Sequence, residues 1–365
     1  MENGRISASQ MALMMYPVVT GTGIIFIPSL TANAAGNDMW LSPVWAASAG
    51  WIAIFTALHL HRLNPNQTII QYSERLLGKF LGKVVSLVLL FFYLVMNGGG
   101  VRIYSDFVTG SFFEETPTYI IVSSMMLLSA FAVRGGVEVI GRTAEMLTPI
   151  YILFLLLVFL LILPDLRPEN ALPMLENGFT PSLKGAYTPQ SWFAEFFVIA
   201  FLIPYVKKEK TAARWGVISL IAVTLTFTAT NLAVLFLLGE DVTAKLNYPL
   251  LDAIQYISIA EFLQHLESIV MAIWVAGAFV KFTVIQYAIV LGTAQVFELT
   301  DYKALVFPLS FLTVLFSFWG IVGEADSTYH SSTVFPLTSL IMQTLLPLGL
   351  LLISYFQKKT GLFPR

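Results

Sequence analysis

Three charged side chains stand inside apolar stretches that are long enough to cross a lipid bilayer: Arg102, Glu195 and Lys281. A charge at mid-membrane costs about 2.5 to 3.5 kcal/mol on insertion scales, so each side chain needs a partner or water. Arg102 and Glu195 fall at similar depths in the outer part of their stretches. We therefore hypothesise that they pair across a central cavity. The alternative is a pair between Arg102 and Asp106 at i, i+4 spacing, with Glu195 facing water.

Lys281 has no acidic residue within one helical turn of the sequence. A buried ammonium group without a partner loses its proton or needs carbonyl oxygens. One interpretation is a fixed positive charge at the place where a transporter holds a coupling cation. The other is a lysine at the inner end of its span that extends toward the membrane surface.

A cluster of small residues, Thr20, Gly21, Thr22 and Gly23, lies about 12 residues into the first apolar stretch. Glycine in a helix interior costs about 1 kcal/mol relative to alanine, and a break at mid-depth exposes backbone groups that need a ligand or cavity. Broken helices at this depth are typical of transporter binding sites. The sequence therefore predicts a broken first helix whose backbone binds a small molecule. The alternative is that the small residues allow close packing of helices.

The residues that most enzymes need are absent or badly spaced. The chain has no cysteine and four histidines. His59 and His61 stand at i and i+2, which point away from each other on a helix, and there is no phosphate-binding loop. We expect no catalytic site, metal ion, cofactor or nucleic acid partner.

The whole chain has the composition of a polytopic membrane protein. It is 57% hydrophobic and 12% charged over 365 residues, whereas a soluble domain carries about 25% charged residues. Each crossing needs roughly 20 apolar residues. Ten apolar stretches meet this need, at about residues 10–32, 41–61, 84–107, 118–134, 144–163, 189–206, 215–238, 267–291, 304–321 and 333–356. The fold class predicted is an all-α bundle of about ten transmembrane helices in a single domain, 1–365.

Basic residues indicate the orientation of these helices, because cytoplasmic loops retain lysine and arginine. Of the 20 basic residues, Arg102 and Lys281 lie inside spans, and Arg167, Lys184 and Lys245 fall in segments that would be outside. All the others lie in the remaining segments, which include both chain ends. The sequence thus predicts that both termini are cytoplasmic.

Ten spans allow two groups of five, and an odd number in each group forces the second to insert upside down. Ile-Gln-Tyr occurs at 70–72 after the second span and again at 254–256 after the seventh. We predict inverted repeats at about 8–165 and 186–357, with interfacial helices at about 66–81 (inside) and 249–264 (outside). Chance or general amphipathicity is the alternative.

Several motifs occur in an order that resembles the spore germination permease-like proteins, the B subunits of nutrient germinant receptors of GerAB type. The resemblance covers about residues 8 to 357. It rests on the glycines of the first span, Arg102 to Phe107, Gly136 to Arg142, Glu195 with Leu202 to Tyr205, and Leu266 to Phe282 with Trp274 and Lys281. One departure is Ala194, since family members often have glycine before the acid in this span. This argues against a transporter-like break in the sixth span, but the sequence leaves open whether that helix is broken.

The resemblance implies the five-plus-five fold of the amino acid-polyamine-organocation transporters, a LeuT-like fold. It implies that spans one, three, six and eight surround a small nutrient, commonly an amino acid. The predicted ligand-binding residues are Thr20, Gly21, Thr22, Gly23, Asn97, Gly98, Glu195, Val198, Ile199, Lys281 and Ile285, and the predicted structural or coupling charges are Arg102, Asp106, Glu195 and Lys281.

The resemblance also implies partners and a location. The chain would assemble with an A-type membrane subunit and a C-type lipoprotein in the spore inner membrane, the bacterial cytoplasmic membrane of the spore, and would trigger germination. The alternative function is a proton-coupled amino acid transporter, in which Lys281 takes the place of a sodium ion.

Overall fold

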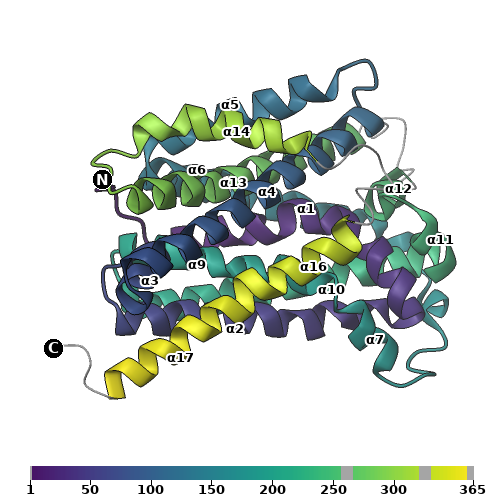
Figure 1. The fold of residues 1–365 in the computed structure, drawn as a ribbon. Coiled ribbons are helices and arrows are strands. Elements are labelled where there is room, and N and C mark those ends of the chain that lie inside the picture. The colour runs from purple at the N-terminus through teal and green to yellow at the C-terminus, as the bar shows by residue number, and fades with distance from the viewer. Residues whose placement is uncertain (1, 256–265, 320–329, 360–365) are drawn as a thin grey trace.

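The computed structural model describes residues 2–255, 266–319 and 330–359, and this part of the chain is a bundle of helices (Figure 1). The long helices are α1 (Ala8–Ala35), α2 (Ser42–Leu63), α4 (Lys79–Ser111), α5 (Thr118–Gly135), α6 (Val137–Ile162), α10 (Glu209–Leu238), α13 (Leu266–Val296), α14 (Val306–Ser317) and α17 (Leu346–Lys359). Shorter helices are α3 (Ile69–Leu77), α7 (Thr180–Gly185), α8 (Pro189–Ala194), α9 (Ile199–Leu202), α11 (Glu240–Lys245), α12 (Pro249–Gln255) and α16 (Phe335–Ser339).

Helical structure covers each of the ten predicted spans in the described residues. Within the described residues, seven stretches have the length and apolar composition to cross a membrane, and the first of them, Ala8–Leu63, holds both α1 and α2. The two remaining spans are the shorter apolar helix Lys303–Ser317 and a run of short helices from Pro189 to Tyr205. The start of α1 and the end of α17 lie at the same side of the bundle in Figure 1, as an even number of crossings requires.

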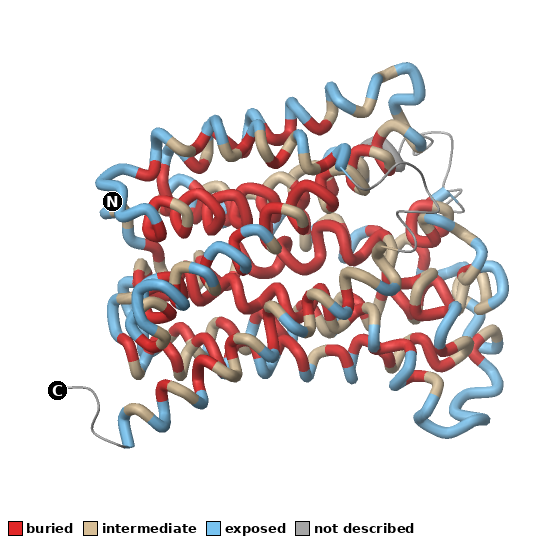
Figure 2. The backbone as a smooth tube through the Cα atoms, viewed as in Figure 1, coloured by how far each residue is buried: buried red, intermediate tan, exposed pale blue. Residues whose placement is uncertain are grey.

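Two helices form the centre of the bundle. α1 packs against α6, α10 and α13, and α13 also contacts α4, α5, α6 and α14. Figure 2 shows these central helices mostly buried, whereas α5 and α17 at the margins expose one face. The exposed side chains there are apolar, such as Leu128, Phe131 and Leu352, which suits contact with lipid. The chain is an integral membrane protein.

α1 is one continuous helix from Ala8 to Ala35, so the break predicted at Gly21 to Gly23 is wrong. The glycines serve close packing instead. A Cβ on Gly21 would lie 3.1 Å from the carbonyl oxygen of Gly277 on α13, so a side chain here would crowd the backbone of α13. Pro17, inside α1, cannot donate a backbone hydrogen bond to Leu13, and the Leu13 carbonyl accepts one from the Thr148 hydroxyl at 2.9 Å.

The sixth span changes from α-helix to 3₁₀ turns along its length, although no glycine marks the change. α8 ends at Ala194, a 3₁₀ turn covers Glu195–Val198, and α9 follows, ending in a second 3₁₀ turn, Ile203–Tyr205. Pro204 explains the second turn, because proline at this position cannot continue the α-helical hydrogen bonds. The backbone stays in the right-handed helical region through both changes, so the sixth span has no break of the kind that frees backbone groups for a ligand.

The two predicted interfacial segments contain helices of limited length. α3 begins at Ile69, within the predicted 66–81 segment, and a tight turn at Gly78 separates it from α4. α12 begins at Pro249, and residues 256–264 of the second segment lie outside the described residues. The location of both helices at a membrane surface, and the repeat boundaries 8–165 and 186–357, stay predictions.

Candidate ligand-binding site

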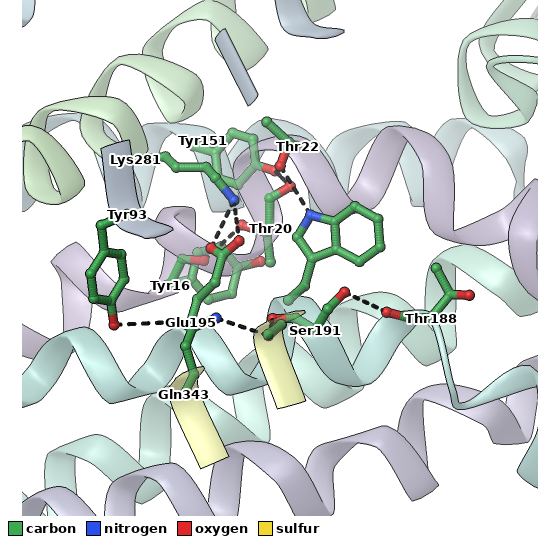
Figure 3. Close-up of polar contacts among 12 residues, drawn as sticks. Tyr16, Thr20, Thr22, Tyr93, Tyr151, Thr188, Ser191, Glu195, Lys281 and Gln343 are labelled. Carbon is green, nitrogen blue, oxygen red and sulfur yellow. Dashed lines mark hydrogen bonds and ion pairs between the residues drawn. The ribbon is translucent and has the colours of Figure 1, made fainter. Parts of the chain in front are cut away.

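The centre of the site is an ion pair between the sixth span and α13. The Lys281 ammonium lies 2.7 Å and 2.9 Å from the two carboxylate oxygens of Glu195, and both side chains are almost fully buried, 4% and 1% exposed. The change from α-helix to a 3₁₀ turn after Ala194 places Glu195 at the start of that turn, from which its carboxylate reaches Lys281 (Figure 3). Lys281 therefore neither lacks a partner nor extends toward the membrane surface.

The predicted pair between Arg102 and Glu195 is wrong. Arg102 Nε lies 2.9 Å from both carboxylate oxygens of Asp106, one turn along α4, and its guanidinium lies over the Phe318 ring at 5.2 Å. The i, i+4 spacing makes Asp106 the nearest acid by local geometry alone. Glu195 is then left to the only central lysine that the described structure brings to it, Lys281.

A small cavity of about 50 Å³ adjoins the ion pair. At 10 to 15 Å³ for each water molecule, this space holds roughly three to five waters or a ligand of few non-hydrogen atoms. Its walls are largely apolar. It is lined by Thr22, Phe26, Met96, Gly99, Gly100, Ile103, Trp192, Glu195, Lys281, His330, Ser331 and Phe335.

Trp192 and Thr22 fix one wall of this cavity. The indole Nε1 donates a hydrogen bond to the Thr22 hydroxyl at 3.1 Å, which ties α8 to α1. The Trp192 ring also meets the Phe335 ring edge-to-face, with 5.6 Å between ring centroids. The wall is thus held by one polar and one aromatic contact between three spans.

A separate chain of hydrogen bonds runs from Tyr93 on α4 through the last span to α8. The Tyr93 hydroxyl donates to Gln343 Oε1 at 3.4 Å, and Gln343 Nε2 donates to the Ser339 hydroxyl at 2.9 Å. Ser339 in turn donates to the Ser191 carbonyl in α8 at 3.2 Å. Gln343 lies in a π-helical turn, Leu340–Leu345, and such turns occur frequently at functional sites. Figure 3 shows Tyr93 and Gln343 on the far side of Glu195 from Thr22.

A second, wider hollow continues from the cavity. It encloses about 180 Å³, shares Phe26, Ile103 and Ser331 with the cavity, and reaches Asp106 and the segment from Ala244 to Tyr248. These residues lie toward the end of the bundle opposite the start of α1 and the end of α17. We call this hollow the outer vestibule. Phe26, Ile103 and Ser331 thus line both the vestibule and the cavity beside the ion pair.

Of the predicted ligand-binding residues, the structure brings Thr22, Glu195 and Lys281 to the cavity. The others line neither hollow. Thr20 donates its hydroxyl to the Tyr16 carbonyl, and Asn97 donates to the Gln286 side chain at 3.1 Å. Close packing surrounds the remaining positions, which are Gly21 against Gly277, Gly23 beside Phe227 and Trp192, Gly98 against Thr313 and Phe316, and the buried apolar side chains of Val198, Ile199 and Ile285.

The residues missed in the sequence carry a weak periodic signal. Met96, Gly99 and Ile103 stand at i, i+3 and i+7 and share one face of α4, from which Asn97 is rotated by about 100°. Thr22 and Phe26 stand at i and i+4 on α1. Trp192 lies three residues before Glu195. Helical spacing from Glu195 would have identified Trp192, and helical spacing from Thr22 would have identified Phe26.

The site can hold a small molecule against apolar walls, with the ion pair of Glu195 and Lys281 as its main polar contact. The ammonium and carboxylate of the ion pair are a donor and an acceptor side by side, and the Thr22 hydroxyl is a third polar group. Pockets of this kind set orientation with few polar groups and set specificity with shape.

The fold is that of LeuT-like transporters. A Na⁺-coupled sialic acid symporter, solved substrate-bound in an outward-open state, aligns with a TM-score of 0.69 at 11% identity, covering 95% of this chain and 79% of that one. MhsT, solved with L-phenylalanine, aligns with a TM-score of 0.67 at 16% identity, covering 93% and 89%. These likenesses establish the fold, and the predicted LeuT-like architecture is confirmed.

A family model described as spore germination protein matches residues 5–321, and the chain belongs to that family. Spore germination protein KB of Bacillus subtilis (strain 168) is 26% identical over 98% of this chain and 97% of its own length. Spore germination protein YndE of the same organism is 25% identical over 97% and 98%. The resemblance inferred from the motifs is confirmed.

Proposed function

We propose that this protein is the B-type subunit of a nutrient germinant receptor, which binds a small nutrient and thereby triggers spore germination. Family membership supports the role in germination. The observation that supports ligand binding is the cavity beside the buried pair of Glu195 and Lys281, which adjoins the outer vestibule. An amino acid fits the chemistry, because its ammonium and carboxylate complement the two charges.

In this proposal the nutrient enters through the vestibule and passes Phe26, Ile103 and Ser331 to reach the ion pair. Its binding shifts the protein between an open and an occluded state, and the shift depends on the difference in affinity for the two states. An A-type membrane subunit and a C-type lipoprotein receive the change. The protein lies in the spore inner membrane with both termini in the cytoplasm, and it acts without catalysis.

The test is ligand binding by the purified chain in lipid nanodiscs, with single amino acids and sugars as probes. Thr22→Val removes the hydroxyl that accepts the Trp192 hydrogen bond and faces the cavity, so we expect about a tenfold loss of affinity, or about 1.4 kcal/mol. Thr230→Val is the matched control, because Thr230 is equally buried in α10 and donates to the Thr226 carbonyl within its own helix. Equal affinities of the two variants would remove this cavity from the site.

The second candidate function is a proton-coupled transporter of amino acids. The LeuT-like fold and the position of Lys281, a fixed cation at the centre of the bundle, favour it. Uptake of labelled amino acid into proteoliposomes that contain only this chain decides between the two. Accumulation driven by a pH gradient supports the transporter, and binding without uptake supports the receptor.

A further inference from the structure

α7 and the residues on either side of it carry an apolar surface that faces away from the bundle. Phe179, Leu183 and Tyr187 stand four residues apart, and all three side chains are exposed. A spacing of four places side chains on one side of a helix. Lys184, beside Leu183, is exposed as well. We refer to residues 179–187 as the foot, and an apolar patch of this kind marks a surface to which something else binds.

The opposite side of the foot is fixed on α1 and α2. The Ser42 hydroxyl donates to the Ser182 carbonyl at 3.0 Å, and Trp45 Nε1 donates to the Ser182 hydroxyl at 3.2 Å. A Cβ on Gly185 would collide with the Ser42 hydroxyl and would lie 2.9 Å from the Ala35 Cβ, so the segments approach closely here. These contacts hold the foot in one orientation, with its three large apolar side chains turned outward.

α2 indicates the depth of the foot in the bilayer. Arg62, near one end of α2, is exposed, so its charge marks one surface of the hydrocarbon. Trp45 lies 17 residues before Arg62, or about 26 Å along the helix, and the hydrocarbon is about 30 Å thick. Trp45 therefore lies near the opposite surface. The Phe179 ring meets the Trp45 ring edge-to-face, with 6.1 Å between ring centroids, which places the foot at the same depth.

The lipid-facing side of α2 continues into the foot. Trp45, Ile52 and Phe55 stand at i, i+7 and i+10, so they share one exposed face of α2. On a membrane-spanning helix such an apolar face contacts lipid. The ring contact between Trp45 and Phe179 joins this face to the foot. Tryptophan and tyrosine are enriched at membrane surfaces, and a lysine there extends its ammonium group to the headgroups.

The foot leads directly into the sixth span. The Gln190 N–H donates to the Ala186 carbonyl at 3.0 Å, and the Ser191 hydroxyl donates to the Thr188 carbonyl at 2.6 Å. These bonds join the end of the foot to α8. Glu195 follows five residues after Gln190. Whatever holds the foot at a fixed depth therefore also holds the start of the span that carries the ion pair.

We propose that the foot is a lipid-binding anchor: Phe179, Leu183 and Tyr187 insert into the boundary between headgroups and acyl chains of the leaflet at the vestibule end of the bundle. The anchor attaches the start of the sixth span to the bilayer. A second protein chain is the other occupant that an apolar surface can take. Continuity with the lipid-facing side of α2, and the depth set by Trp45, favour lipid. The inference goes beyond the proposed function and needs no nutrient.

The test uses the absence of cysteine from the chain, because a single Leu183→Cys then carries a fluorescent probe at the centre of the foot. The labelled protein is placed in phosphatidylglycerol and phosphatidylcholine vesicles, with and without phosphatidylcholine that bears a spin label at the top of its acyl chain. Spin labels quench fluorescence only at short range. Since the apolar side of an interfacial helix lies about 5 to 10 Å into this boundary, we expect the spin-labelled lipid to reduce the emission roughly twofold or more.

Val242→Cys is the matched control. Val242 is 47% exposed, against 51% for Leu183, and α11 is also a helix of six residues. α11 follows the end of α10, where Leu238 lies 24 residues, or about 36 Å, beyond Arg214. α11 thus lies beyond the hydrocarbon, and we expect little quenching there. Equal quenching at both positions, or none at Leu183, would overturn the proposal, because the first shows that the probe itself enters the lipid and the second that water or another chain covers the foot.

A photoreactive lipid gives a second measurement on the unaltered chain. The vesicles then contain a phospholipid with a diazirine in its acyl chain, and illumination should attach this lipid to residues 179–187 but not to residues 240–245. Attachment to neither segment, or to both equally, would contradict the proposal. Neither measurement involves a nutrient, so failure of the anchor and failure of the proposed function are distinguishable.

Discussion

The ion pair of Glu195 and Lys281 makes the sharpest prediction for stability. Both side chains are at least 96% buried and their charged atoms lie 2.7 Å apart, so removal of one partner leaves a charge without compensation in the core. Such a change costs about 3 to 5 kcal/mol in buried pairs, because the remaining charge keeps its desolvation cost and loses its attraction. We expect this loss for Lys281→Met and a similar loss for Glu195→Leu.

The double variant separates this explanation from lost packing. With both charges gone, no desolvation cost remains, so Glu195→Leu/Lys281→Met should recover most of the loss or exceed wild-type stability. The assay is unfolding of the purified chain in mixed micelles with increasing sodium dodecyl sulfate. A double variant whose loss equals the sum of the single losses, or a cost under about 1 kcal/mol for Lys281→Met, would refute the argument.

Two other predictions follow from packing and from surface charge. Gly21→Ala places a Cβ 3.1 Å from the Gly277 backbone, which cannot move aside as a side chain can, so we expect a loss of about 1 to 3 kcal/mol in the same unfolding assay; Gly349→Ala, whose Cβ meets open space in α17, should instead be neutral or slightly stabilising. Hydrogen bonds from Lys83 and Lys79 lower the pKa of Glu298, so its contribution to stability is present above the ordinary glutamate pKa and is lost as pH falls through the lowered value. The difference in melting temperature between wild type and Glu298→Gln should therefore vanish only below the usual range of glutamate; a difference that disappears near neutral pH would contradict the assignment.

The sequence by itself determined the number of spans and the family. Apolar length is a local property, because each crossing must satisfy its own backbone hydrogen bonds within about 20 residues. Gly136 to Arg142 and the other motifs likewise have fixed order and spacing along the chain. These features need no knowledge of which helix faces which.

Tertiary structure decided which charges meet. Glu195 and Lys281 are 86 residues apart in sequence, and Arg102 stands at a depth that suits Glu195 equally well. Depth along a helix can be estimated from the distance to its end, but the direction of a side chain depends on the rotation of each helix in the bundle. Arg102 pairs with Asp106 on its own helix and is therefore not the partner of Glu195. The rotation of α13 in the bundle places Lys281 beside Glu195 instead.

The glycine cluster of α1 likewise shows what the sequence alone cannot predict. Gly21 to Gly23 predict either a break or close packing, and both follow from the lack of a side chain. The approach of Gly277 on α13 selects close packing. The change from α-helix to a 3₁₀ turn lies at Glu195 instead, where no glycine marks it. Residue type determined which positions can form helices. The place where helix geometry changes, and the face of each helix that lines the cavity, depend on contacts between segments distant in sequence.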